Sequence, residues 1–92
     1  MSTENTTHIF TSILRKLQTW TIAPLPKSFI IEAVQSFGRT PVIATLNGKE
    51  WATSLWTEKS GETMIAVPKK VRGKLEEGDE VEISFIYDYE RF

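Results

Sequence analysis

The chain contains no cysteine, which excludes a disulfide framework, a thiolate metal site and a thiol nucleophile. It has one histidine, His8, at the edge of a polar N-terminal stretch and with no partner residue nearby in the sequence. General-base and metal-binding roles need an oriented imidazole and a second group. We therefore expect an incidental surface histidine and predict no metal site and no cofactor.

Glycine-rich and nucleophile motifs are missing as well. The five glycines are scattered singly, so no phosphate-binding loop is present. No Gly-x-Ser-x-Gly surrounds Ser54, Ser60 or Ser84, and no base is available to activate a hydroxyl. These absences predict that the protein is not an enzyme and has no catalytic residues.

Long apolar runs are also absent. No stretch approaches the roughly 18 residues of a membrane span, and the polar residues 1–7 lack a basic-then-apolar signal pattern. We expect a cytoplasmic protein that does not contact a membrane. We also expect residues 1–7 to be a disordered tail, followed by one domain over residues 8–92.

What is present indicates a folded chain. Of its 92 residues, 40% are hydrophobic and 25% are charged, as in soluble globular proteins. The net charge is −1, but it is uneven: residues 1–75 carry ten basic and five acidic side chains, whereas residues 76–92 carry one basic and seven acidic. A basic stretch beside an acidic one suggests a self-neutralising surface more than a nucleic-acid groove.

Apolar and β-branched stretches predict a mainly β fold of six or seven strands. Residues 8–22 indicate two short strands or one long bent strand. Asn47-Gly48 is a strong hairpin signal between strands at 40–46 and 50–56, since both residues tolerate positive φ. Further strands are expected at 62–67 and from Val81 onward. The Glu77-Gly78-Asp79 turn precedes the last strand, and there we expect Asp79 to bond local backbone N–H groups.

Prolines mark the starts of two predicted helices. Pro26 precedes apolar residues at helical spacing up to Phe37, and Gly38 is a suitable stop. Pro68 precedes a shorter helix up to Leu75, with Val71 and Leu75 facing inward. These two segments are expected to cap the strands.

Two stretches of the chain resemble each other. Residues 22–29 and 65–71 both read as strand, then Pro-Lys opening a helix, followed by a glycine turn and another strand. The two Pro-Lys pairs begin at Pro26 and Pro68. Chance similarity of a common unit is the alternative, but two copies are typical of a pseudo-twofold domain.

The second copy resembles one half of the swapped-hairpin barrels of AbrB-type and MazE-type bacterial regulators. Their half reads strand, Pro-Lys-x-hydrophobic-Arg, x-x-Leu, Gly-Asp-x-Val, strand. The matching residues are Pro68, Lys69, Val71, Arg72, Leu75, Gly78, Asp79 and Val81. Those regulators build a barrel from two chains, and this chain resembles both halves in one.

Together with further short motifs, the two halves resemble a prokaryotic family known only as domain of unknown function nineteen-oh-five. The motifs are Leu25-Pro26, Gly38-Arg39, Leu46-Asn47-Gly48, Ser54-Leu55 and Gly61. The resemblance runs from about Phe10 to Asp88. It implies a double-split β-barrel capped by helices at both ends, and it implies no activity.

Four basic residues form the sharpest candidate site for nucleic-acid or anion contact: Lys69, Lys70, Arg72 and Lys74. On a helix these side chains would face outward while Val71 faces inward. The alternative is a solvated face that balances the helix dipole and pairs with Glu76, Glu77 or Asp79. The first half of the repeat offers Lys27 and Arg39 but no comparable run.

Three tryptophans are many for this length. Trp20, Trp51 and Trp56 could stack on a ligand, or they could supply apolar area to a small core. We expect Trp51 in the core and expect Trp56, beside a turn, to be partly exposed.

Three functions remain open. The first is a non-catalytic binding or interaction module whose partner, a protein or a small ligand, is unknown. The second is a DNA-associated regulator that uses the basic helix, although the net charge disfavours nucleic acid. The third, an enzyme, is remote. Because both half-barrels lie in one chain, we expect a monomer or a weak dimer.

Overall fold

A single antiparallel sheet organises the part of the chain that the structure describes. The computed structural model describes residues 6–26 and 38–91. Its strands are β1 (His8–Ile13), β2 (Arg15–Leu17), β3 (Trp20–Pro24), β4 (Arg39–Leu46), β5 (Lys49–Thr57), β6 (Thr63–Ala66) and β7 (Glu80–Tyr87). Their order in the sheet is β1-β7-β4-β5-β6-β3-β2. The mainly β class and the prediction of six or seven strands are therefore confirmed.

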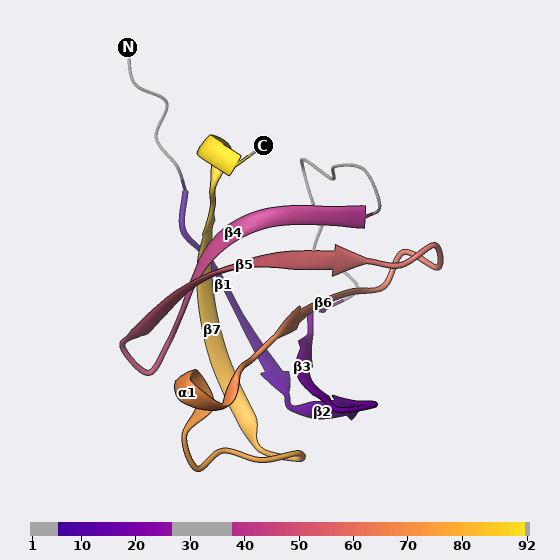
Figure 1. Cartoon of the computed structure of the whole chain (residues 1–92), viewed down its shortest axis with the longest axis vertical. Helices are drawn as coiled ribbons and strands as arrows, with labels where there is room; N and C mark the ends of the chain where they lie inside the picture. Colours follow the sequence, from indigo (N-terminus) through magenta and orange to yellow (C-terminus); the bar gives the residue numbers. More distant parts are fainter. Residues whose placement is uncertain (1–5, 27–37, 92) are drawn as a thin grey trace.

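The sheet curls strongly, so that strands from its two ends approach each other (Figure 1). Ser12 in β1 donates its hydroxyl hydrogen bond to the carbonyl oxygen of Pro24 in β3. The sheet is therefore a curled half-barrel around one apolar interior. Most of the core residues are less than 5% exposed, including Val42, Ala44, Leu55, Ile65 and Ile83.

The β4–β5 hairpin forms where Asn47-Gly48 predicts it. Arg39 pairs with Trp56 at one end of the ladder and Leu46 pairs with Lys49 at the other. Asn47 and Gly48 both have positive φ, 50° and 79°. These values match the primed turn that suits the right-handed twist of a hairpin. The turn therefore sets the register of the two longest neighbouring strands.

The N-terminal region differs from the prediction of one or two strands, because it contains three. Leu14 separates β1 from β2, and its backbone leaves the ladder to bond the turn before β7. Leu14 N donates to Asp79 O (2.9 Å), and Gly78 N donates to Leu14 O (2.8 Å). The Leu14 side chain is 1% exposed. Burial of this side chain and the two hydrogen bonds explain the break.

The prediction of two capping helices is not confirmed. The predicted helix from Pro26 to Phe37 falls almost entirely outside the described residues. The predicted helix from Pro68 to Leu75 is wrong in length, since α1 spans only Lys69–Arg72. Gly73 ends it with a φ of 58°, which glycine adopts without strain. A further short helix that the sequence did not predict, η2 (Tyr89–Arg91), follows β7.

The two similar stretches of sequence lie against each other in the sheet. Ile22 pairs with Ala66, and Ala23 pairs with Ile65, where β3 meets β6. Equivalent backbone bonds flank this contact, from Leu25 N to Thr63 O and from Val67 N to Thr21 O, both 2.9 Å. The paired copies therefore have a local twofold relation, which places Thr21 beside the start of the basic segment.

Among the described residues, no helix is long and apolar enough to cross a membrane.

Candidate functional site

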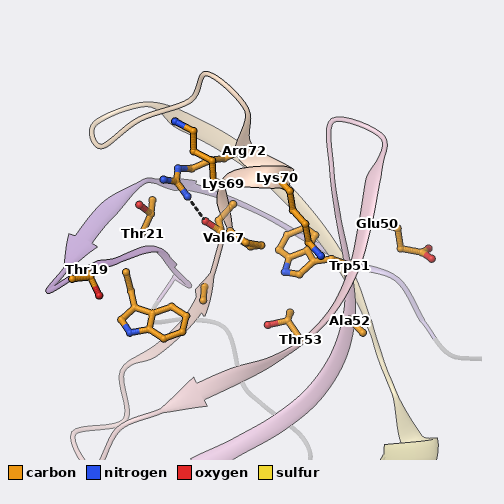
Figure 2. A pocket seen from close by; sticks show the side chains of 13 residues that line it. Thr19, Thr21, Glu50, Trp51, Ala52, Thr53, Val67, Lys69, Lys70 and Arg72 are labelled. Carbon is orange, nitrogen blue, oxygen red and sulfur yellow. Dashed lines mark hydrogen bonds between the residues drawn. The ribbon is translucent and has the colours of Figure 1, made fainter.

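An open cavity of about 760 Å³ lies beside α1. We call it the basic groove. Three segments line it, namely the β2–β3 turn with the start of β3, the first half of β5, and the end of β6 with α1 (Figure 2). The lining residues are Thr19, Trp20, Thr21, Glu50, Trp51, Ala52, Thr53, Ala66, Val67, Pro68, Lys69, Lys70 and Arg72.

The local sequence explains why cations line one wall of this groove. Val71 is 5% exposed and anchors α1 to the core. Its neighbours on the short helix therefore face outward, and Lys69 and Lys70 are exposed. Arg72 is half-buried, and its Nη1 donates to the carbonyl oxygen of Val67 at 2.9 Å (Figure 2). This bond holds the guanidinium at the wall and uses one of its five N–H donors.

The structure brings together three of the four predicted basic residues. Lys69, Lys70 and Arg72 line the basic groove, whereas Lys74 does not. The prediction that Lys74 lies on the same helix as the other three is wrong, because the helix ends at Arg72 and Gly73 turns the chain. Lys74 is exposed beyond that turn.

The acidic residues that follow the basic segment in the sequence form no ion pair with it in the described part of the chain. Within residues 6–26 and 38–91, the ion pairs are Arg15–Glu62 and Arg91–Asp88, and none involves the four basic residues. Glu77 Oε2 instead accepts from the Lys16 backbone N–H (3.2 Å). Asp79 Oδ2 accepts from the Glu76 N–H (2.8 Å), which confirms the predicted turn role of Asp79. The expected pairing of the cations with these acids is not found in the described part of the chain.

Two tryptophans line the groove in different ways. Trp51 is 8% exposed and belongs to the core, as predicted. Trp20 is 62% exposed, because it follows the β2–β3 turn at the end of the sheet. Trp56 is 45% exposed, which confirms the prediction of partial exposure, although Trp20 is the more exposed of the two. Trp56 lines an adjacent apolar cavity, which shares Trp20 and Ala66 with the basic groove. Arg39 lies 5.3 Å from the Trp56 ring centroid.

The indole nitrogen of Trp51 lies in an unusual environment for a hydrogen-bond donor. Its Nε1 is buried and has no hydrogen-bond partner among the described residues. The great majority of buried donors in proteins are paired, and leaving one unpaired costs about 1–3 kcal/mol. Trp51 and Thr53 share the face of β5 that lines the groove, whereas Glu50 turns away toward its rim (Figure 2).

Sequence reasoning missed the threonines that line the groove, whereas Trp20 was among the tryptophans considered for stacking on a ligand. Thr19, Thr21 and Thr53 occur in strand-like segments with no motif that marks them as functional. The internal repeat is the signal that could have found Thr21. If its two copies pair about a twofold axis, Thr21 must lie beside Val67, as observed.

His8 is not the isolated surface residue that the sequence suggested. It is half-buried, and its ring stacks on Phe85 at 5.2 Å between centroids. It also meets the edge of Tyr87 at the same centroid distance. Residues far apart in sequence surround it, which is why no partner was visible locally. In the described part of the chain, no group of three or more metal-ligating residues comes together.

Comparison with known proteins identifies the family. No curated protein matches the chain significantly. The family model described as "Domain of unknown function (DUF1905)" matches residues 10–85. This range covers most of the chain, including every groove residue and the whole of the paired repeat. The chain therefore belongs to the DUF1905 family.

Proposed function

We propose that this domain is a non-catalytic binding module that holds a small anionic ligand in the basic groove. The observation that carries the proposal is the gathering of Lys69, Lys70 and Arg72 on one wall, free of carboxylate partners among the described residues. A positively lined concave surface concentrates the field and attracts anions. The family itself has no assigned function, so the proposal rests on this geometry.

The charges of the basic groove favour a negatively charged ligand. Three cations and one carboxylate, Glu50, line it, and the carboxylate is turned away from the cations (Figure 2). A charge about 4 Å from an opposite charge near a protein surface gains about 1–4 kcal/mol before desolvation is subtracted. An anion that reaches all three cations therefore retains a net attraction.

The groove residues support binding rather than catalysis. Glu50 is the only carboxylate among the described residues that line it, and no histidine lines it. General acid–base chemistry most often uses a histidine or a carboxylate within hydrogen-bond reach of the reacting atoms. Lysines, threonines and tryptophans instead supply donors and flat surfaces, which suit recognition.

The finer features of the fold are part of the same proposal. We place the curled sheet among the double-split barrels and relate it to the AbrB-type and MazE-type bacterial regulators, in a cytoplasmic prokaryotic protein. The antiparallel contact of the repeated segments through β3 and β6 supports this relation. DNA binding does not follow from it, because a duplex on α1 would meet the exposed acids at 76, 77, 79 and 80.

A titration with inorganic pyrophosphate, followed by ¹H–¹⁵N correlation spectra, tests the proposal. We expect saturable shifts of the amides of residues 69–72. The double variant Lys69→Gln/Lys70→Gln should weaken binding about tenfold, since it removes two ion contacts. The control Lys59→Gln/Lys74→Gln loses the same charge outside the groove and should bind like the wild type. Shifts that do not saturate, or equal losses in both variants, would contradict the proposal.

A further inference from the structure

The basic groove is larger than an inorganic anion requires. Its volume of about 760 Å³ lies within the range of sites for organic ligands, roughly 300–1,000 Å³. An ion the size of phosphate would leave most of that space to water. The ligand that fits the groove must therefore extend beyond its anionic group.

Trp20 indicates what that extension is. This residue is 62% exposed although it lines a concave site, so the described residues cover only part of it. An exposed indole that lines such a groove is a platform for a flat ring, and stacking of nucleic-acid bases on aromatic side chains is strong and tolerant of base identity. A planar aromatic ring is therefore the part of the ligand that fits against Trp20.

Trp51 Nε1 indicates a second feature of the ligand. This donor is buried, unpaired among the described residues, and carried by a side chain that lines the same groove. A ligand oxygen or ring nitrogen that reaches it would supply the missing acceptor. Because the atom has almost no exposed surface, an incoming acceptor must displace a neighbouring side chain. Lys70 is exposed and flexible and lines the same groove, so its displacement is inexpensive.

We propose that the ligand is a nucleoside monophosphate or a close chemical equivalent, with a phosphate on the cations, a flat ring on Trp20 and an acceptor on that ring bound by Trp51 Nε1. This inference rests on the proposed function, since it names the ligand class of the same groove. The threonine hydroxyls at 19, 21 and 53 add donors and acceptors for the sugar.

The test compares a complete ligand, adenosine 5′-monophosphate, with two probes that each contain part of it, ribose 5-phosphate and adenosine. Affinities are measured by calorimetry, and the three indole N–H signals are followed in ¹H–¹⁵N spectra. We expect the nucleotide to bind about tenfold more tightly than ribose 5-phosphate, because stacking adds to the phosphate contact. We also expect the Trp51 signal to move downfield with the nucleotide and not with ribose 5-phosphate.

Three variants separate the roles of the tryptophans. Trp51→Phe removes the N–H and should weaken nucleotide binding about fivefold, as loss of one hydrogen bond does. Trp20→Ala changes an exposed residue, so the fold should survive, and it should reduce the nucleotide to the affinity of ribose 5-phosphate. Trp56→Phe is the control, since Trp56 lies outside the groove and should not affect binding.

The outcomes distinguish this inference from the proposed function. Equal affinity for the nucleotide and ribose 5-phosphate, with no effect of Trp20→Ala, overturns the nucleotide inference and leaves anion binding intact. Absence of binding by both phosphate probes overturns the two proposals together. If Trp51→Phe unfolds, the movement of the Trp51 signal in the wild-type protein still decides the role of Nε1.

Discussion

Two buried threonines illustrate how single residues set the stability of this sheet. Thr40 in β4 is 0% exposed, and its hydroxyl has no hydrogen-bond partner among the described residues. Thr63 in β6 is also buried, but its hydroxyl lies 3.0 Å from that of Thr57. A buried hydroxyl costs free energy when unpaired and repays that cost when bonded. The same substitution should therefore have opposite effects at the two sites.

We predict that Thr40→Val raises the free energy of unfolding by about 1 kcal/mol, because valine has a similar shape and no polar atom to desolvate. Thr63→Val should lower it by about the same amount, since the Thr57 hydroxyl loses its partner. Urea denaturation followed by tryptophan fluorescence measures both values. A loss of stability in Thr40→Val would show that its hydroxyl has an unrecognised partner.

At the scale of elements, hydrogen bonds from Arg91 hold η2 against the middle of the sheet. Arg91 Nη2 donates to two carbonyl oxygens, Val42 O at 2.8 Å and Thr53 O at 2.7 Å. Its Nε also bonds Asp88. One guanidinium therefore joins η2 to both β4 and β5. Thr53 lies on the groove wall, so this clamp also supports the candidate site.

We predict that Arg91→Lys lowers the free energy of unfolding by about 1–2 kcal/mol, although it keeps the charge. An ammonium cannot reproduce the fork of the guanidinium that bonds several oxygens at once. Glu90→Gln is the control, because Glu90 is an exposed neighbour in the same short helix. Thermal unfolding measures both variants. Equal melting temperatures for Arg91→Lys and the wild type would show that the clamp contributes nothing.

At the scale of the whole molecule, the sheet is a curled half-barrel with two outer strands. β1 and β2 are the outer strands of the sheet order. β1 approaches β3 through the Ser12–Pro24 hydrogen bond, and β2 has three residues, too few for a stable intermolecular ladder. Exposed Ile9 and Ile13 on β1 are the main apolar side chains near an outer edge.

We predict that the protein is a monomer, or at most a weak dimer, at micromolar concentration. Sedimentation velocity measures this state directly. Ile9→Thr/Ile13→Thr keeps β-branched side chains on the exposed face of β1 and should abolish any weak dimer. A tight tetramer, or a dimer that the double variant does not affect, would contradict the prediction.

Local patterns predicted a large part of the fold. The Asn47-Gly48 turn, the strands on both sides of it and the last strand from Val81 onward all follow from short-range rules. The break at Leu14 could not be predicted, because it depends on hydrogen bonds to a turn some 65 residues away. The length of α1 was misjudged because Leu75 continued the helical spacing beyond Gly73.

The candidate site was predicted in part. Lys69, Lys70 and Arg72 were recognisable because they are consecutive or nearly so, and charge is visible in the sequence. Lys74 was grouped with them on the same evidence, but the positive φ of Gly73 turns the chain away from the groove. The opposite wall, with Trp20 and Thr21, depends on which strands pair and could not be seen from spacing.

By itself the sequence determined the β class, the hairpin register, the basic segment and the presence of two related halves, since each depends on neighbours along the chain or on composition. Only the tertiary structure decided that the two halves pair through β3 and β6, that Trp51 buries an unpaired N–H, and that three cations share a groove with two tryptophans. The physical reason is that a concave site is made by side chains from strands distant in sequence, whose contacts exist only after the sheet has curled.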